Sequence, residues 1–327
     1  MLLKEYEELL ERLPLSTVEY AFAYGSGALQ QKDENKAEKM IDFILSTNDP
    51  VVFHTENIQK NPSHYSLLRW IGAKPLSRFQ TGLAARVYYN THVKVGRRQM
   101  KYGVVTTENL NQDLLDWRWL YVSGRLHKPV LDVTAIKSNL EENRRSALHT
   151  ALLLLPDSFP LEELYEKIVS LSYSGDFRMF IGEDRGKVKK IVHGSMMELS
   201  DIYGPLLAND SKLVVQNGNV SWHLKIVLQD GSTSAIYHRL NLLPSTVLNA
   251  VKRNWNKRNK LQKDTEEVLF SLAHRHDVST HVSSAISSIV APAALSQTLK
   301  NAASAGFSRS VIYSISKLMK MTRSLTR

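Results

Sequence analysis

Hydrophobic positions in the first part of the chain alternate between strand-like runs and stretches of helical periodicity. Apolar residues at helical spacing, set among Glu and Lys, predict a surface helix over residues 3–13 that ends at Pro14. Runs rich in β-branched and aromatic residues predict strands at residues 18–24, 40–46, 85–89 and 101–106. Helical periodicity is found at residues 64–71 and 109–120. We therefore expect a small sheet flanked by helices.

From about residue 138 the hydrophobic pattern becomes mainly helical. Helices are predicted at residues 140–155 and 161–171, and a β-hairpin at residues 213–216 and 220–228. Asn217-Gly218 is the turn signal of that hairpin. Asp264 and Glu267, which precede an apolar run, predict the start of a further helix. Helices followed by a hairpin are typical of a winged-helix module, although other α+β arrangements share this outline.

The last fifty residues differ in composition and read as an appended tail. Residues 278–327 are rich in Ser, Ala and basic side chains, and no acidic residue follows Asp277. Within them, Val311, Ile315 and Leu318 lie on one face of a helix that also carries Lys and Arg. Such a basic amphipathic helix over residues 308–327 suits an anionic membrane surface. A helix docked on the body of the protein by its apolar stripe is an equally good interpretation.

Composition narrows the class of protein. A chain of 327 residues can form two domains, and its absence of cysteine excludes disulfides, thiol catalysis and Cys-ligated metals. No uninterrupted apolar run reaches the roughly 18 residues of a spanning helix, so we expect a soluble or peripheral protein. The formal net charge of +10 favours anionic partners. We see neither a secretory signal nor an Arg-rich transit peptide, so a presequence is either lacking or removed.

The Gly-Ser-Gly turn after the first predicted strand is the first candidate site. Gly25 and Gly27 allow the backbone to approach a triphosphate closely, and Ser26 can hold phosphate oxygens. Asp42, on the next predicted strand, is a candidate ligand for the Mg²⁺ that bridges those oxygens. An ordinary turn and an ordinary strand carboxylate would look the same, so this pattern alone is weak.

Two later segments carry further candidate residues. Arg125 and Lys128 lie three residues apart beside Gly124 and suit a triphosphate, although a solvated loop with two surface cations fits as well. Asp113 is a candidate second carboxylate, with a capping role as the alternative. The segment 172–178, with dense hydroxyls, a glycine and an Asp/Arg pair, is a plausible edge of a polar pocket or a simple helix-ending turn.

A basic run with one aromatic residue supports a different function. Residues 252–260 place Trp255 among Lys and Arg, which could track a nucleic-acid backbone while the ring stacks on a base. A basic linker between helices is the commoner explanation. The histidines are too scattered for a metal site, and neither a nucleophile elbow nor a Walker lysine loop is present.

Several short motifs, taken in order, closely resemble the mitochondrial translocator assembly and maintenance family over roughly residues 15–320. The motifs are Tyr24-Gly25-Ser26-Gly27, Asp42-Phe43-Ile44, His54-Thr55-Glu56-Asn57, His64-Tyr65-Ser66, Tyr102-Gly103-Val104, Asp113-Leu114-Leu115-Asp116-Trp117, Gly124-Arg125-Leu126-His127-Lys128-Pro129 and Ser172-Tyr173-Ser174-Gly175-Asp176-Phe177-Arg178. Members of that family are peripheral CDP-diacylglycerol synthases (phosphatidate cytidylyltransferases) of the matrix face of the mitochondrial inner membrane, although bacterial relatives, cytoplasmic or on the inner membrane surface, exist. The resemblance implies CTP, Mg²⁺ and phosphatidate as reactants and a role in cardiolipin synthesis.

The resemblance also implies a fold and a set of site residues. It predicts an α+β protein with a polymerase-β-like nucleotidyltransferase domain at residues 1–135, a winged-helix-like domain closing the site at 136–277, and the basic tail at 278–327. Its implied catalytic residues are Asp42, Lys128 and Asp176, and Mg²⁺ would be bound by Asp42, with Asp113 as a candidate second ligand. Its implied nucleotide contacts are Gly25, Ser26, Gly27, Tyr102, Arg125, Lys128, Ser174 and Arg178.

One position departs from the wider nucleotidyltransferase pattern. That superfamily usually has a second carboxylate two residues after the first, where this chain has Ile44. Phosphatidate attacks with a phosphate oxygen that is already largely ionised near neutral pH, because its second pKa is about 6 to 7 by analogy with phosphoserine. No general base is then required, and one metal can suffice. We hypothesise in-line attack on the α-phosphorus of CTP, with pyrophosphate as the leaving group.

Two other functions stay open at this point. A nucleotidyltransferase acting on RNA or protein is supported by the basic run around Trp255, although we expect no nucleic-acid partner. A non-enzymatic assembly factor on a membrane surface is the second alternative.

Overall fold

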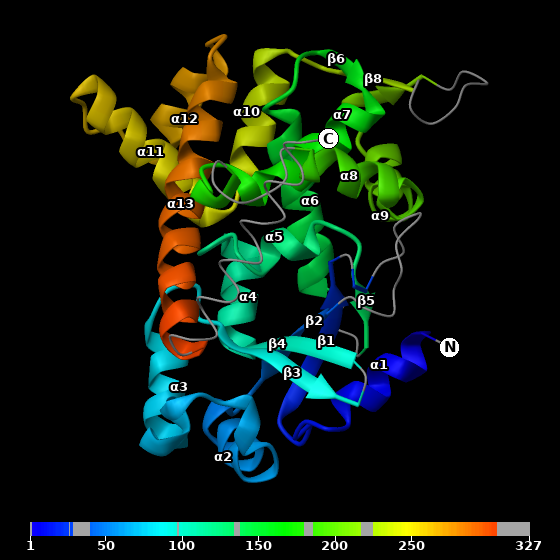
Figure 1. Cartoon of the computed structure of the whole chain (residues 1–327). Helices are drawn as coiled ribbons and strands as arrows, with labels where there is room; N and C mark the ends of the chain where they lie inside the picture. The colour runs from blue at the N-terminus through cyan, green and yellow to red at the C-terminus, as the bar shows by residue number, and fades with distance from the viewer. Residues whose placement is uncertain are drawn as a thin grey trace, which may run out of the picture.

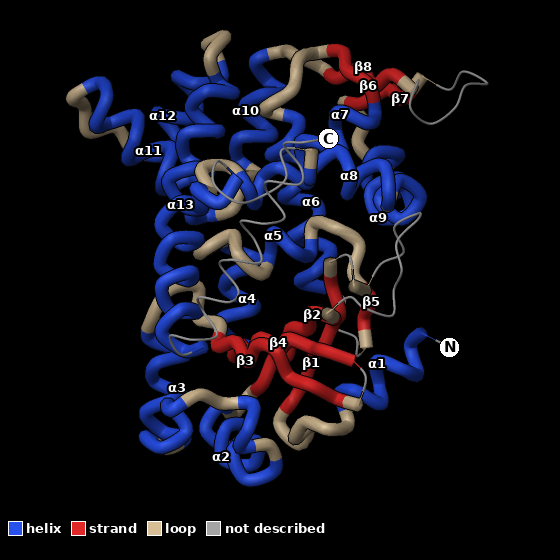
Figure 2. The backbone as a smooth tube through the Cα atoms, in the orientation of Figure 1, coloured by secondary structure: helices blue, strands red, loops and turns tan. Residues whose placement is uncertain are grey.

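The computed structural model describes residues 2–25, 27–28, 40–96, 98–133, 138–179, 186–216 and 225–305. Strands gather in two places: a larger sheet in the N-terminal part and a small sheet at the far end of the helical part (Figure 2). A long helix near the C-terminus runs along both parts (Figure 1). The α+β class predicted from the sequence is therefore confirmed.

The larger sheet is mixed and has five strands. Its strands are β1 Val18–Tyr24, β2 Ile41–Thr47, β3 Tyr88–Val95, β4 Arg98–Thr106 and β5 Leu131–Asp132, in the order β3-β4-β2-β1-β5. Strands β2 and β4 are parallel, and the other neighbours are antiparallel. The strand expected at 85–89 begins only at Tyr88. Ala84 and Arg86 have positive φ, which is incompatible with extended backbone, so the strand starts after them.

Helices cover both faces of this sheet. Around the sheet lie α1 Leu2–Leu10, α2 Pro50–Lys60, α3 Ala73–Gly82, α4 Thr107–Asp116 and α5 Ser123–Leu126, with 3₁₀ turns η2 Pro62–His64 and η3 Leu67–Ile71. One face packs Phe43 and Tyr102 against α1 and α2, and the other packs Phe22 and Ile44 against α4 and α5. The predicted N-terminal helix is confirmed. The run predicted at 64–71 forms 3₁₀ turns instead.

The helical part surrounds a second hydrophobic core. It contains α6 Ser138–Leu152, α7 Leu161–Ser170, η4 Leu171–Tyr173, η5 Phe177–Met179, α8 Lys187–Gly194, α9 Met196–Ala208, α10 Thr233–Asn241, α11 Ser245–Asn259 and α12 Thr265–Ala273. Its small sheet has the order β6-β8-β7, with β6 Ser158–Pro160, β7 Leu213–Val215 and β8 Ile226–Gln229. Strands β7 and β8 are antiparallel, as the predicted hairpin requires, while its Asn217-Gly218 turn lies outside the described residues. Asp264 caps α12 in a capping box with Glu267, as predicted.

Helix α13, Val278–Ala305, corrects our expectation of an appended tail from residue 278. Its first half places Val282 and Ile286 in the core of the helical part. Its second half reaches the sheet part, where Gln297 accepts a hydrogen bond from the backbone N–H of Ala85 and donates one to the carbonyl of Val87. The predicted amphipathic helix at 308–327 lies outside the described residues.

Among the described residues, one helix is long and apolar enough to cross a membrane by these two criteria. It is the segment Val278–Ser304 of α13, and half of its most apolar window is buried inside the protein. The core helix of a soluble protein meets the same criteria, so the finding is weak evidence for a membrane span. The contacts of α13 with both cores show that it is part of the fold.

Candidate functional site

Asp42 and Lys101 form an ion pair on one face of the larger sheet. They are direct cross-strand partners on the parallel strands β2 and β4, so their side chains leave the sheet on the same side. Lys101 Nζ lies 3.4 Å from Asp42 Oδ1, and the two side chains are 16% and 26% exposed. The Nζ atom also lies 4.6 Å from the ring centre of Tyr89. Lys101 was not among the residues predicted from the sequence.

The glycine turn that follows β1 lies beside this carboxylate. Gly25 has φ +78°, and a Cβ added there would lie 3.8 Å from Asp42 Oδ2. Gly27 has no room for a Cβ, which would lie 2.4 Å from the carbonyl oxygen of Met40. The backbone therefore needs glycine at both positions, for conformation at one and for close approach at the other. Ser26 lies outside the described residues.

Arg125 places its guanidinium between two aromatic rings of the same face. Its Cζ lies 5.3 Å from the ring centre of Tyr24 and 4.0 Å from that of Tyr121. Nη1 donates a hydrogen bond to the carbonyl oxygen of Tyr121. Nε is buried and has no hydrogen-bond partner among the described residues. Tyr24 is the cross-strand partner of Asp42, so the guanidinium and the carboxylate share one side of the sheet.

The carboxylate of Asp113, considered above as a metal ligand, is bound by backbone N–H groups. Its carboxylate accepts hydrogen bonds from four backbone N–H groups at 2.7–3.1 Å, those of Trp119, Tyr121, Val122 and Ser123. Asp113 is also buried. Because both oxygens are used by the backbone, this geometry argues against a metal ligand and supports the capping alternative. The carboxylate holds the loop that leads from α4 into α5, and α5 carries Arg125.

Lys128 lies where the sheet part and the helical part meet. Its Nζ donates a hydrogen bond to Ser172 Oγ at 3.1 Å and lies 4.6 Å from the ring centre of Tyr173. Burial lowers the pKa of Lys128. A Cβ on Gly124 would lie 2.2 Å from Ser172 Cβ, so this glycine permits the close contact between α5 and η4. The sequence-predicted segments 124–129 and 172–178 are thus brought together.

Asp176 and Arg178 form a bidentate pair on the helical side of this junction. Arg178 Nη2 lies 2.6 Å from Asp176 Oδ2, and Nε lies 3.0 Å from both carboxylate oxygens. Asp176 is buried, whereas the Arg178 side chain is 29% exposed. Ser174 Oγ donates to the carbonyl of Ser170 at 3.3 Å. Asp176 and Arg178 therefore do form an ion pair, and both oxygens of the Asp176 carboxylate accept hydrogen bonds from Arg178.

Arg125 lies over the ring of Tyr121, and the charges of Arg178 and Lys101 also act on this tyrosine. Burial raises the pKa of Tyr121, but the neighbouring charges of Arg125, Arg178 and Lys101 outweigh it and lower the pKa overall. We call these three residues, which come from α5, η5 and β4, the cationic cluster. The site is therefore strongly cationic, as a site for phosphate groups should be.

Tyr102 lies on the opposite face of the sheet from this cationic cluster. It is the cross-strand partner of Phe43, one position along from the Asp42–Lys101 pair, so strand alternation directs it to the other side. Its hydroxyl accepts a hydrogen bond from Asn57 Nδ2 at 2.7 Å and lies 2.8 Å from His64 Nδ1. The structure thus does not bring Tyr102 together with the other predicted nucleotide contacts.

The residues present fit a metal held by one carboxylate. In the part of the chain that the structure describes, no group of three or more His, Asp or Glu side chains could hold a metal ion. Asp42 Oδ1 is buried and has no hydrogen-bond partner among the described residues, apart from the ion pair with Lys101. A single carboxylate oxygen together with substrate phosphate oxygens is an ordinary Mg²⁺ ligand set.

The basic run that supported nucleic-acid binding lies in α11. Trp255 is 6% exposed, its ring centre lies 5.2 Å from that of His281, and Arg275 lies over its face. The indole is therefore part of the second core and is not available to stack on a base. This removes the specific feature that favoured RNA as a substrate.

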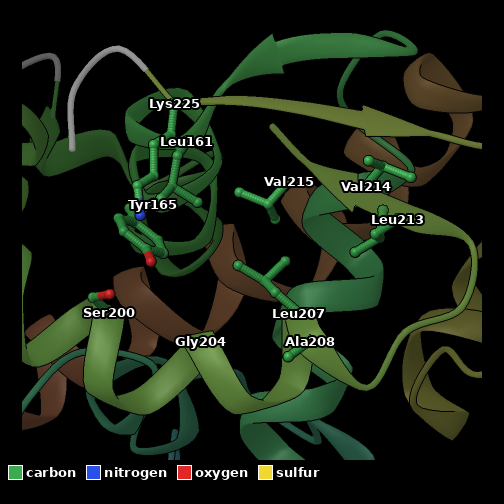
Figure 3. A pocket seen from close by; sticks show the side chains of 10 residues that line it. All are labelled: Leu161, Tyr165, Ser200, Gly204, Leu207, Ala208, Leu213, Val214, Val215 and Lys225. Atoms are coloured by element: carbon green, nitrogen blue, oxygen red, sulfur yellow. The ribbon is translucent and has the colours of Figure 1, made fainter. Parts of the chain in front are cut away.

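A separate pocket of about 500 Å³ lies in the helical part, between α7, α9 and β7 (Figure 3). Its lining is mainly apolar, with the hydroxyls of Tyr165 and Ser200 facing each other on one side and Lys225 at its edge. None of its lining residues belongs to the cationic cluster.

Comparison with known proteins identifies the family. A family model described as "Phosphatidate cytidylyltransferase, mitochondrial" matches residues 6–320. The protein of that name from Caenorhabditis briggsae is 60% identical over 324 residues, covering 98% of this chain and 99% of the relative. The Caenorhabditis elegans protein is 58% identical over the same shares, and the Xenopus laevis protein is 41% identical over 99% and 96%. The chain therefore belongs to the mitochondrial phosphatidate cytidylyltransferase family.

Proposed function

We propose that this protein transfers the cytidylyl group of CTP to phosphatidate, which yields CDP-diacylglycerol and pyrophosphate. The observation that carries the proposal is near full-length similarity to phosphatidate cytidylyltransferases at up to 60% identity. The cationic face around Asp42 supports it, because both substrates are phosphate anions. The protein is thus an enzyme of phospholipid synthesis and supplies the precursor of cardiolipin.

The proposed binding roles follow the arrangement of the cluster. Asp42 would hold Mg²⁺, which would neutralise phosphate oxygens of CTP when bound. The Gly25–Gly27 turn, beside Asp42, would receive the triphosphate through its backbone N–H groups. Arg125 and Lys128 would neutralise the triphosphate from the α5 side, and Ser174, Asp176 and Arg178 would complete the site from the helical part.

The proposed reaction needs no general base. An ionised phosphate oxygen of phosphatidate attacks the α-phosphorus of CTP, and the bond from that phosphorus to the bridging oxygen breaks. Negative charge accumulates on the departing pyrophosphate, where the fixed guanidinium of Arg125 and the ammonium of Lys128 stabilise it. Ile44, two residues after Asp42 on β2, is fully buried and apolar, so this position supplies no second carboxylate.

We assign different roles to the two parts of the structure. We assign the five-stranded sheet with its helices to a nucleotidyltransferase domain, and the helical part with the β6-β8-β7 sheet to a winged-helix-like domain that closes the site. Relatives of this chain are named as mitochondrial. By that likeness we propose that the protein acts at the matrix face of the inner membrane, with residues 308–327 contacting the anionic membrane surface.

The experiment that tests this function follows the cytidylyl group. The full chain is incubated with Mg²⁺, CTP labelled at the α-phosphate, and either phosphatidate liposomes or RNA. Label in the organic phase, with release of unlabelled pyrophosphate, supports the proposal. Label in RNA alone would favour the RNA-directed alternative. Liposome binding without any pyrophosphate release would favour the non-enzymatic assembly factor.

A further inference from the structure

Lys101 is the cation that lies closest to the proposed metal-binding carboxylate. We propose that its ammonium group contacts the reacting phosphates and holds the phosphate of phosphatidate against the α-phosphate of CTP. The proposal deepens the function proposed above and rests on it. Lys101 would remain protonated throughout, so it forms no covalent bond and transfers no proton.

The reaction needs a cation at this position because nucleophile and electrophile are both anions. Where a second carboxylate could hold a second metal, this chain has the buried Ile44. Lys101 Nζ lies 3.4 Å from Asp42 Oδ1. A phosphate bound to a metal on Asp42 would therefore also lie close to the ammonium charge of Lys101. A protein-borne ammonium can thus supply the charge that a second metal supplies elsewhere.

The other cations near the proposed site have different positions. Arg125 lies over the rings of Tyr24 and Tyr121. Arg178 is held by the buried carboxylate of Asp176 in a bidentate pair. Lys128 reaches across to Ser172 at the junction with the helical part. Lys101, by contrast, is carried by a central strand directly beside β2, which fixes its stem relative to Asp42. The geometry therefore assigns Lys101 to the reacting phosphates and the other cations to the outer parts of the substrates.

This placement has a consequence that a merely structural lysine would not have. The ammonium of Lys101 and a divalent cation compete for the same carboxylate and repel each other. Replacing Lys101 by the uncharged, similarly shaped Met should therefore tighten divalent-cation binding while it slows cytidylyl transfer. A structural defect would weaken both.

The test uses the full chain and Mn²⁺ as the probe. Free Mn²⁺ is followed by electron paramagnetic resonance in titrations of the wild type, Lys101→Met, Lys101→Arg and Lys94→Met. Lys94 is exposed on the neighbouring strand β3 and serves as the matched control. We expect Mn²⁺ to bind Lys101→Met about tenfold more tightly than the wild type, because one repulsive charge is gone. Lys94→Met should bind it as the wild type does.

Transfer to phosphatidate is measured on the same proteins. We expect kcat of Lys101→Met to fall on the order of a hundredfold, with the Kd for CTP nearly unchanged and partial recovery in Lys101→Arg. Unchanged kcat, or Mn²⁺ binding that weakens together with kcat, would overturn the proposal. If the wild type makes no CDP-diacylglycerol, the proposed function fails, and the phosphate role of Lys101 fails with it. The Mn²⁺ titration then still shows whether Lys101 and a cation compete for Asp42, so the two failures are distinguished.

Discussion

The two faces of the larger sheet carry opposite kinds of polar chemistry at adjacent positions of the same strands. On one face, Asp42 and Lys101 form a partly exposed ion pair beside Arg125, whose Nε has no hydrogen-bond partner in the described part of the chain. On the other face, Tyr102 joins a hydrogen-bonded network in which burial lowers the pKa of His64 to about 4 and so keeps it neutral near pH 7.

The network face is built from neutral groups with complementary donors and acceptors. Asn57 Nδ2 donates to the hydroxyls of Tyr65 and Tyr102, and His54 bridges Tyr65 and Gln80. Burial lowers the pKa of His54 to about 4 as well. Most of these neutral groups bond one another, although Gln80 Nε2 is buried without a hydrogen-bond partner among the described residues. The opposite face carries charged groups instead, among them the Asp42–Lys101 pair. The comparison of the two faces shows that polar sequence motifs can stabilise the fold as readily as they can form a binding site.

The largest expected effect comes from removing the carboxylate of the charged face. Asp42→Asn should lower kcat for CDP-diacylglycerol formation by on the order of a thousandfold, because a neutral amide holds Mg²⁺ poorly. The free energy of unfolding should fall by no more than about 1 kcal/mol, since the substitution removes only the partly exposed ion pair with Lys101. Asp201→Asn, an exposed position on α9, is the control. Full Mg²⁺-dependent turnover in Asp42→Asn would show that the charged face is not the reaction centre.

The next effect concerns the close contact between α5 and η4, where the sheet part meets the helical part. Gly124→Ala should destabilise the protein by about 1–3 kcal/mol and reduce turnover, because the new methyl group would lie 2.2 Å from Ser172 Cβ. Denaturant unfolding and the lipid-transfer assay measure the two effects.

A second substitution separates steric crowding from a general loss of folding. Ser172→Gly removes the atom that clashes, so the double variant should regain much of the stability lost in Gly124→Ala. It should not regain full activity, because Lys128 loses its hydrogen-bond acceptor. Equal stability of the single and double variants would contradict the proposed contact.

Tyr102→Phe tests the network face and should have the opposite effect to Asp42→Asn: lower stability with unchanged turnover. Removing the hydroxyl leaves Asn57 Nδ2 and His64 with one partner fewer, which costs about 1–2 kcal/mol in the free energy of unfolding. Turnover per folded molecule should match the wild type, since the ring lies on the side of the sheet away from Asp42. A large loss of kcat in a stably folded Tyr102→Phe would show that Tyr102 contributes to the reaction after all.

Much of the sheet could be predicted from the sequence, because β-branched and aromatic runs bounded by turn residues mark strands directly. The same runs placed Asp42 on a strand and the glycine turn at the end of the preceding strand. Lys101 was missed although a signal existed: strict alternation along β4 places it on the side opposite Tyr102, and hence on the side of Asp42. That inference requires knowing that β2 and β4 are parallel neighbours, which the sequence does not reveal.

Other parts depended on tertiary contacts that leave no local pattern. The spacing of Asp113 in a helical run could not distinguish a metal ligand from a cap, because the four N–H groups it binds become available only when the loop folds back. Helix α13 was taken for a tail since its Ser and Ala content resembles that of a linker. Its buried positions are defined by two cores formed by distant segments.

Lys300 gives the smallest expected effect and tests the rule that the network face avoids charge. It extends from α13 and donates to the carbonyls of Gln80 and Leu83 at the end of α3. Burial, helped by the neighbouring charge of Arg86, lowers the pKa of Lys300 to about 7 from its ordinary 10.5. The unfolded chain then binds more protons than the folded protein between those pH values, so this residue makes stability rise with pH.

The expected size is about 1 kcal/mol between pH 7 and pH 8, because the lysine is mostly protonated in the unfolded chain and largely neutral in the folded one at pH 8. Denaturant unfolding at the two pH values measures it in the wild type and in Lys300→Met, which should lack this increment. Lys252→Met on α11 is the control and should keep it. If Lys300→Met kept the full increment, Lys300 would be charged in the folded state, and a buried ammonium held by two carbonyls would coexist with the neutral network around His54.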